Sequence, residues 1–388
     1  MPVASSARTK RRGTRADGRN GAARARALLP MSMDAMIQVL IVEVSTAVRM
    51  LLEHLLDSDP DICVIGAVAD RKGMFDFLRH SRPDVILMDV YMTDTNGLDA
   101  TRHVMETQPL PIVICSATAG ELVFRALEAG ALACVEKPLG DGTFHDSVTV
   151  RKLLQTVKTM SEVKVVRRWR MPAGALQPSA LLRAPLAPSL ARLKGKIVGL
   201  GSSTGGPPAL QTLLAGLPDD FPAPILVVQH IAKGFLPGMM AWLSQTTGLP
   251  VQLGNHGLLP LPGQVYFAPD NCHMGLGETG RISLSTADAE NGVRPAVGFL
   301  FRSLADVAGP DAVGVLLTGM GKDGALELKR MKDAGAVTIA QDRATSVVHG
   351  MPGAAIALGG ATHVLPIDRI AGALLACVKP EPENAEGK

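Results

Sequence analysis

The first half of the chain alternates between short apolar runs and segments whose apolar residues recur at helical spacing. The apolar runs are rich in Val, Ile and Leu without polar alternation, which is typical of parallel strands buried on both faces. They are QVLIVE (38–43), ICVIGAVAD (62–70), DVILMDV (84–90), LPIVICSA (110–117) and ACVEKP (133–138). The helical segments between and after them lie at 48–58, 71–80, 98–107, 121–130 and 146–160. This alternation predicts a doubly wound parallel α/β domain over residues 37–158.

The pattern breaks at residues 159–193, which are rich in Pro, Ala and Arg and have no clear period, as expected of a linker between domains. A second alternating region follows over 194–378 and predicts another α/β domain with a mostly parallel sheet. Its strand candidates are 196–200, 223–230, 264–270, 282–285, 312–319, 336–342 and 362–366. Its helix candidates are 208–217, 236–247, 297–309, 324–335 and 368–378.

Composition and charge narrow the class of protein. The chain has 388 residues and a formal net charge of only +3, much of it carried by an Arg-rich extension at 1–36. We expect this extension and the polar tail at 379–388 to be disordered. No basic face argues for nucleic acid, and no apolar stretch reaches the roughly 20 residues needed to span a bilayer. The five cysteines are not spaced as the ligands of a metal site would be. Scattered free cysteines are compatible with a reducing cytoplasm.

Polar residues follow the strand-like runs of the first domain. Glu43, Asp89, Ser116 and Lys137 each stand at the end of a run, and open α/β sheets place ligands at the carboxyl ends of their strands. Carboxylates are ligands for Mg²⁺. The hydroxyl and the ammonium can bind a phosphoryl group, so the four residues predict a phosphate switch at one edge of the sheet.

The segments LIVEVSTAVRMLL, RPDVILMDVYM, PIVICSAT and VEKP resemble the receiver domain of response regulators. The resemblance implies that Asp89 accepts a phosphoryl group, that Ser116 and Lys137 contact it, and that Glu43 and the carbonyl of Tyr91 hold Mg²⁺. One position departs from the family, which normally has two adjacent acids where this chain has Glu43 and Val44. Two readings follow. Asp89 is phosphorylated with weakened Mg²⁺ binding, or the receiver is a phosphate-independent docking module.

The second domain opens on a glycine-rich turn, GLGSSTGGPPAL (199–210), between a strand-like run and a helical segment. Such a turn can cradle a phosphate at a helix N-terminus, or it can hold a serine nucleophile on a sharp elbow. If the turn bound the phosphates of a dinucleotide, an acidic residue would be expected about 20 residues after it, at the end of the next strand. Asp219 and Asp220 fall instead in a loop before that strand, which disfavours a dinucleotide site.

A serine nucleophile needs a base and an acid that orients it. Ser203 is central in G-x-S-x-G, His230 ends an apolar run, and Asp323 lies in a glycine-rich loop after another run. These three residues are the predicted triad. Spacing alone leaves other candidates open: His256, His273 and His349 as the base, and Asp270 and Asp342 as the acid.

Six ordered segments resemble the catalytic domain of chemotaxis-type protein-glutamate methylesterases (CheB type): LGSSTGGPPAL, VVQHIAKGFLPGMMAWL, VYFAPDNCHM, RPAVGFLFRSLA, LLTGMGKDGA and IAQDRATSVVHGMPGAAIALG. The resemblance implies Ser203 as nucleophile, His230 as general base, Asp323 as its orienting acid and the backbone N–H of Met320 as an oxyanion donor. It also implies hydrolysis of glutamate γ-methyl esters on chemoreceptors, a second glutamine deamidase activity and no catalytic cofactor. A chemotaxis-type histidine kinase is the implied phosphodonor, with Mg²⁺ required in the receiver, and phosphorylation is expected to relieve inhibition by the receiver.

Overall fold

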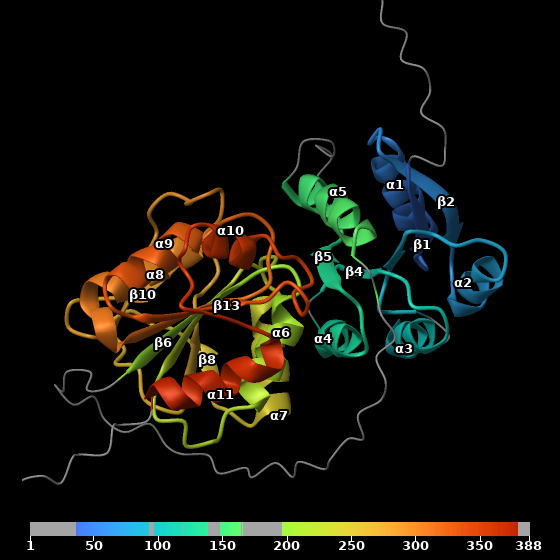
Figure 1. Ribbon diagram of the computed structural model, residues 1–388. Coiled ribbons are helices and arrows are strands. Elements are labelled where there is room, and N and C mark those ends of the chain that lie inside the picture. The colour runs from blue at the N-terminus through green and yellow to red at the C-terminus, as the bar shows by residue number, and fades with distance from the viewer. Residues whose placement is uncertain are drawn as a thin grey trace, which may run out of the picture.

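The structure is a computed structural model that describes residues 36–378 except 93–96, 119, 139–147, 164 and 166–195. It contains two α/β domains, each built on its own parallel sheet (Figure 1). The predicted N-terminal extension, almost all of the predicted linker and the C-terminal tail lie outside the described residues. None of the described helices is both long and apolar enough to cross a bilayer.

The receiver half confirms the predicted doubly wound sheet. Five parallel strands are ordered β2-β1-β3-β4-β5. The strands are β1 (Ile37–Val42), β2 (Ile62–Val68), β3 (Val85–Met88), β4 (Ile112–Ser116) and β5 (Ala133–Glu136). The helices are α1 (Thr46–Asp57), α2 (Arg71–Leu78), α3 (Gly97–Thr107), α4 (Glu121–Glu128) and α5 (Val148–Ser161). Side chains start two of them: Ser45 accepts a hydrogen bond from Val48 N at α1, and Asp70 accepts one from Gly73 N at α2.

The C-terminal domain has a seven-stranded sheet ordered β14-β13-β12-β6-β7-β9-β8, with every paired neighbour parallel. The strands are β6 (Ile197–Ser202), β7 (Ile225–Gln229), β8 (Val251–Leu253), β9 (Val265–Phe267), β12 (Ala312–Leu316), β13 (Val337–Gln341) and β14 (His363–Leu365). The strand order reverses beside β6, and ligand sites of open α/β sheets lie at such switch points.

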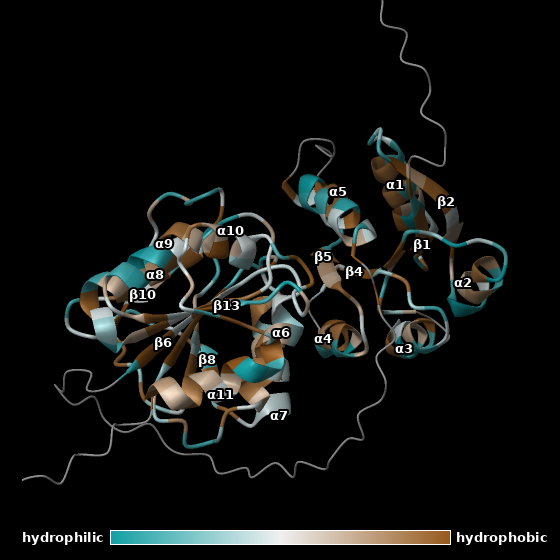
Figure 2. Ribbon diagram, in the orientation of Figure 1, coloured by the Kyte–Doolittle hydropathy of each residue, from teal (hydrophilic) through white to brown (hydrophobic). Residues whose placement is uncertain are grey.

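Helices cover both faces of this sheet. The helices α6 (Gly206–Ala215), α7 (Leu236–Thr247) and α11 (Ile367–Val378) pack in one buried apolar cluster. On the opposite face, α8 (Val297–Val307), α9 (Ala325–Asp333) and α10 (Met351–Ala357) pack in another. Figure 2 shows hydrophobic residues gathered in the strands and on helix faces turned toward them. Adjacent residues of β6 alternate between the clusters: Ile197 belongs to one and Val198 to the other.

The structure adds three local details to these expectations. The segment 282–285 is strand β11, but it pairs antiparallel with β10 (His273–Leu276) in a separate hairpin. The pattern also missed helix α10, whose short sequence MPGAAIA has too few turns to show a helical period. Helix α5 runs to Ser161, so the first residues of the predicted linker are helical.

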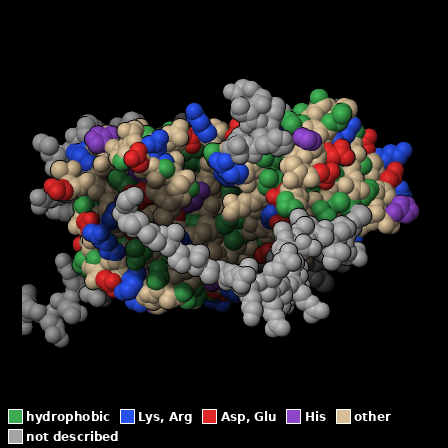
Figure 3. Space-filling view, turned by 90° about the horizontal axis from the view of Figure 1, so that it is seen from above, with side chains coloured by type: hydrophobic (Ala, Val, Ile, Leu, Met, Phe, Trp, Pro, Cys, Tyr) green, Lys and Arg blue, Asp and Glu red, His purple; other side chains and the backbone are tan. Residues whose placement is uncertain are grey.

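The two domains share a buried apolar contact. Helix α4 of the N-terminal domain packs against α6 and α7 of the C-terminal domain, and one core cluster continues across both (Figure 1). On the face drawn in Figure 3, acidic and basic side chains are interspersed over both domains.

Candidate active site

Ser203 lies on a sharp turn between β6 and α6. Its backbone N–H donates to Thr318 O at 3.0 Å, and Gly206 N donates to Ser203 O at 2.7 Å. Gly205 has a φ of +76°, which favours glycine, and a Cβ there would lie 2.5 Å from Val347 Cβ. The half-buried serine therefore stands at the carboxyl end of β6, three residues before the helix begins.

His230 and Asp323 meet at the carboxyl ends of the strands that flank β6. His230 follows β7, and Asp323 lies in the loop after β12. His230 Nε2 is 3.0 Å from Asp323 Oδ2, and the carboxylate is only 5% exposed. No hydrogen bond joins the Ser203 hydroxyl to the imidazole within the described part of the chain; such catalytic contacts are often long before substrate binds.

The Asp323 carboxylate is held at the N-terminus of α8. It accepts Val297 N at 2.7 Å and Gly298 N at 3.1 Å, and Asn291 Nδ2 lies 3.4 Å away. Burial favours the neutral acid, but the hydrogen bond and charge of His230 and the two backbone N–H groups outweigh it and lower the pKa of Asp323 below its ordinary value. The acid is thus fixed as an anion by a helix start as well as by the imidazole.

Gln229 is a site residue that sequence reasoning missed. Its buried amide Nε2 donates to Ser203 O and His230 O, both at 2.9 Å, and its Oε1 accepts the Ser202 hydroxyl at 2.6 Å. A Cβ on Gly206 would lie 2.0 Å from Gln229 Oε1. One side chain therefore ties the backbone of the serine turn to the backbone of the histidine.

Thr318 makes a second connection that the sequence did not reveal. Its buried hydroxyl donates to Thr204 O at 2.9 Å and accepts Val348 N at 2.9 Å. Gly319 follows, and a Cβ there would lie 2.8 Å from Ser203 Cβ. The next residue, Met320, has a backbone N–H with no hydrogen-bond partner among the described residues. This loop thus carries a backbone N–H without a partner among the described residues, one position after the glycine that packs against Ser203.

The other candidates are engaged elsewhere. His273 is fully buried, with Nε2 at 3.0 Å from Asp288 O and Nδ1 accepting Ala296 N. His256 Nδ1 accepts Leu284 N, and the ring of His349 lies 3.4 Å from the Ser346 hydroxyl. The carboxylates of Asp270 and Asp342 accept hydrogen bonds from Gly234 N and from Thr345, respectively. Within the described part of the chain, none of these five side chains is hydrogen-bonded to Ser203, His230 or Asp323.

The receiver brings three of its predicted residues together at the carboxyl end of its sheet. Lys137 Nζ lies 2.7 Å from Glu43 Oε2 and 2.6 Å from Asp89 Oδ2, and all three side chains are buried. Burial favours the neutral amine, but the contacts with the Asp89 and Glu43 carboxylates outweigh it and hold the pKa of Lys137 above its ordinary value. The pocket is therefore an ion triad with its ammonium in the centre.

The remaining receiver candidates contact this triad less directly. Tyr91 donates its backbone N–H to Asp89 Oδ1 at 3.1 Å, while its side chain is exposed. Ser116 is fully buried, but its hydroxyl donates to Thr118 O. Val44 lies beside Glu43 and is half-buried.

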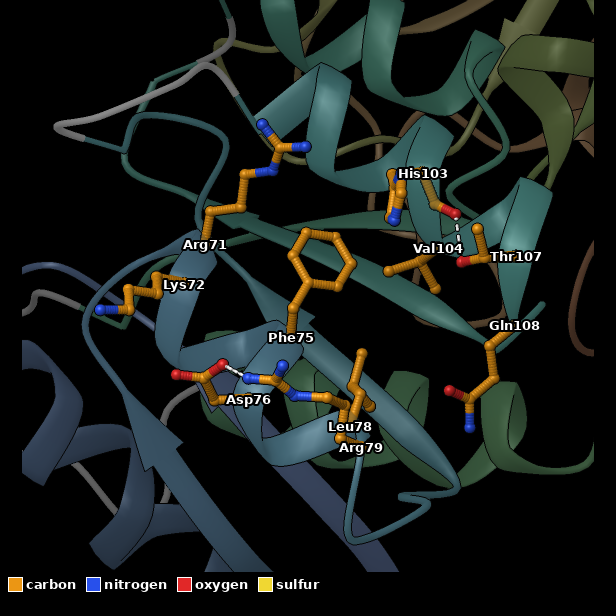
Figure 4. Close-up of a pocket in the computed structure, with 10 residues that line it drawn as sticks. All are labelled: Arg71, Lys72, Phe75, Asp76, Leu78, Arg79, His103, Val104, Thr107 and Gln108. Atoms are coloured by element: carbon orange, nitrogen blue, oxygen red, sulfur yellow. Dashed lines mark hydrogen bonds and ion pairs between the residues drawn. The ribbon is translucent and has the colours of Figure 1, made fainter.

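A separate hollow of about 770 Å³ lies between α2 and α3 of the receiver (Figure 4). Arg71 lies over the Phe75 ring, whose edge meets His103. The cationic groups do not converge there, because Arg79 is paired with Asp76 and Lys72 points away. This hollow adds nothing to either site.

Known proteins match both halves of the chain. Residues 198–374 match the family model described as CheB methylesterase, and residues 39–149 match the response regulator receiver domain. A protein-glutamate methylesterase/protein-glutamine glutaminase of Nitrosospira multiformis is 49% identical over 91% of this chain and 100% of its own length. One from Geobacter metallireducens is 50% identical over 87% of this chain and 98% of its own.

A solved structure is also similar. The CheB methylesterase catalytic domain of Thermotoga maritima is 42% identical, with a TM-score of 0.47, covering 48% of this chain and 100% of that domain. The full-length relatives match both domains in one alignment, and their curated names describe a hydrolase. The chain therefore belongs to the CheB methylesterase family, the chemotaxis hydrolases that carry a response-regulator receiver domain.

Proposed function

We propose that the chain hydrolyses glutamate γ-methyl esters on chemoreceptors, with Ser203 as the nucleophile, His230 as the general base and Asp323 as its orienting acid. The observation that carries the proposal is the convergence of Ser203, the His230–Asp323 pair and the free Met320 N–H at the ends of β6, β7 and β12. These groups are the parts that acyl transfer needs.

The bond between His230 Nε2 and Asp323 decides which nitrogen acts as base. Donation from Nε2–H to the carboxylate leaves Nδ1 unprotonated and able to take the Ser203 proton. As Nδ1 takes that proton, Ser203 Oγ attacks the γ-carbonyl carbon and the carbonyl oxygen becomes an oxyanion. Asp323, held as an anion, stabilises the imidazolium that forms.

The oxyanion would be stabilised by the backbone N–H of Met320. Losing one such donor typically costs about 10²–10³ in rate. Collapse of the tetrahedral intermediate breaks the bond to the methoxy oxygen, which takes the proton from His230 and leaves as methanol. Water then attacks the acyl-enzyme and gives a proton to His230, and Ser203 regains its proton as glutamate is released.

The same chemistry fits a glutamine side chain, with ammonia as the leaving group. The relatives are named as glutaminases as well as methylesterases. We therefore propose protein-glutamine deamidation as a second activity of the same three residues. None of the proposed steps uses a metal or an organic cofactor. We place the reaction in the cytoplasm, because chemoreceptor glutamates and a phosphodonor kinase would meet the enzyme there.

We propose that the receiver restrains the esterase through the contact of α4 with α6 and α7. Phosphorylation of Asp89 by a chemotaxis-type histidine kinase, with Mg²⁺ as receivers generally require, is one way to release it. Docking that does not depend on phosphate is the other, and Val44 beside Glu43 favours it.

The experiment that tests the catalytic proposal is methanol release from a methylated chemoreceptor. Ser203→Ala should abolish release, while Thr212→Ala, which removes an exposed hydroxyl on the following helix, should not change it. Release by Ser203→Ala at the wild-type rate would overturn the assignment. Ammonia release from an unmodified receptor glutamine tests the second activity with the same pair of variants.

A further inference from the structure

The acidic pocket of the receiver already contains its own cation. The carboxylates of Glu43 and Asp89 both contact the Lys137 ammonium, at 2.7 and 2.6 Å. Their other oxygens accept backbone N–H groups: Ser45 N bonds Glu43 Oε1 at 2.9 Å, and Tyr91 N bonds Asp89 Oδ1 at 3.1 Å. Three of the four carboxylate oxygens therefore accept a hydrogen bond, and the fourth, Glu43 Oε2, lies in ion-pair contact with the ammonium without a hydrogen-bond partner among the described residues.

These residues do not fit Mg²⁺ well. Mg²⁺ requires near-octahedral oxygen ligands and gives up its waters reluctantly. Val44 offers a hydrocarbon side chain where the receiver family normally has a second acid. Across the described ranges, no cluster of three or more His, Cys, Asp and Glu side chains could hold a metal ion. A Mg²⁺ ion would have to compete with the Lys137 ammonium for the carboxylates of Glu43 and Asp89. Position 44 would not supply a third carboxylate.

The charge of the pocket supports the same conclusion. Two carboxylates and one ammonium leave a net charge of −1, whereas an acid at position 44 would make it −2. Phosphorylation replaces the single charge of Asp89 by a group of about −1.5 to −2. Without a divalent ion, Lys137 alone would have to balance that group and Glu43 in a buried site, where unbalanced charge is costly.

We propose that Lys137 acts as the permanent counter-cation of this receiver, and that Val44 leaves its Mg²⁺ affinity too low for efficient phosphorylation of Asp89. The receiver is then a docking module whose state is set by its contact with α6 and α7. This inference selects the second of the two regulatory modes under the proposed function. Its test does not use Ser203, so its failure would leave the esterase proposal intact.

The test restores the missing acid. We titrate three proteins with Mg²⁺ by calorimetry: wild type, Val44→Asp and Val44→Ala. Each is also incubated with acetyl phosphate and Mg²⁺, and its mass is then measured by intact-protein mass spectrometry. We expect Val44→Asp to bind Mg²⁺ at least about tenfold more tightly than wild type, since ligand charge strongly affects the affinity of such sites. It should also gain about 80 Da, the mass of one phosphoryl group, and lose this adduct in Val44→Asp/Asp89→Asn.

Val44→Ala is the matched control, because it removes the apolar side chain without adding an acid, and it should behave as wild type. Lys137→Met provides an independent variant: with the ammonium gone, Glu43 and Asp89 need another cation, so Mg²⁺ binding should tighten. The inference is overturned if wild type is phosphorylated as readily as Val44→Asp. It is overturned equally if neither Val44→Asp nor Lys137→Met binds Mg²⁺ more tightly than wild type.

Discussion

Phe124 of α4 and Trp242 of α7 stack across the boundary between the two domains, with ring centroids 5.8 Å apart and 24° between the ring planes. Both side chains are almost fully buried, at 0% and 1% exposure. Among the described residues, the indole Nε1 of Trp242 is buried without a hydrogen-bond partner. The contact is therefore held by apolar burial and ring packing, so its strength should follow the size and shape of these two side chains.

A weaker contact between the Phe124 and Trp242 rings should raise the esterase activity. In Phe124→Leu the apolar core of α4 is kept but the ring pair is lost, and such pairs contribute about 0.5–1.5 kcal/mol beyond their buried area. If the receiver restrains the active site, methanol release should rise by roughly 2- to 10-fold. Phe75→Leu, on the α2 side of the receiver, should leave release unchanged.

A spectroscopic measurement separates opening of the contact from other effects. In a Trp169→Phe background, Trp242 is the remaining tryptophan, and its emission should shift to the red when Phe124→Leu exposes it to water. Faster methanol release without a red shift would argue against domain opening. A red shift without faster release would show that the receiver does not restrain the esterase.

Asp323→Asn should abolish most of the esterase activity, although Asn has nearly the same shape as Asp. An amide can donate to the imidazole and so favours the wrong tautomer; the corresponding change in triad hydrolases typically lowers kcat about 10⁴-fold. Burst kinetics with an activated ester would show slower acylation. Asp342→Asn, in the rival acid after β13, should retain nearly wild-type acylation, and loss of activity there instead would reverse the assignment.

The same carboxylate should make stability depend on pH. The pKa of Asp323 is lowered in the folded chain from an ordinary value of 3.8, so the unfolded chain binds the proton more readily. The stability that Asp323 contributes is therefore fully present above pH 3.8 and is lost as the pH falls below that value toward the folded pKa. Thermal melts of wild type and Asp323→Asn should differ at pH 6 and converge in acid. A constant difference at every pH would contradict this linkage.

Gln229 should act as a positioning residue. Gln229→Glu places a carboxylate against the carbonyls of Ser203 and His230, where the amide donated two hydrogen bonds. We expect kcat to fall about 10- to 100-fold, as small displacements of reacting groups often cause. Because Gln229 contacts backbone groups of the site rather than the substrate, KM should change little.

Gln229→Met is the control for that experiment. It is similar in size but can make none of the three hydrogen bonds of the amide, so it should lower kcat as well. A rise in KM with kcat unchanged would instead assign Gln229 to substrate binding. Unchanged kcat in both variants would remove the positioning role altogether.

Residues that end strands could be found from the sequence, because apolar runs mark buried strands and the polar residue after each run marks an edge. Ser203, His230 and Asp323 were identified this way, but their closeness depends on β6 lying between β12 and β7, which no local pattern encodes. Spacing left Asp342 open beside Asp323, and the family resemblance favoured Asp323, whose Oδ2 lies 3.0 Å from His230 Nε2. In the receiver, the pattern placed Glu43, Asp89 and Lys137 at one edge, where the structure brings them together.

Gln229 and Thr318 were missed for a different physical reason. Each bonds backbone groups of at least one segment distant in the sequence, and backbone groups carry no signature in the sequence. Gln229 reads as the last residue of an apolar strand and Thr318 as a polar residue before a glycine turn. The sequence pattern identified β11 but not its antiparallel partner β10, because strands this short carry little periodicity.

Thr318 provides the sharpest test of how the loop after β12 is held against the serine turn. Thr318→Val preserves the side-chain shape but leaves Thr204 O and Val348 N without their hydroxyl partner, at a cost of about 1–3 kcal/mol for each buried group. The loop carries Met320, so its displacement should weaken oxyanion stabilisation, lowering kcat while KM changes little. Thr318→Ser keeps the hydroxyl and should restore most of kcat. Equal kcat values for the Val and Ser variants would show that the hydroxyl does not position the loop, and a rise in KM alone would assign Thr318 to substrate binding instead.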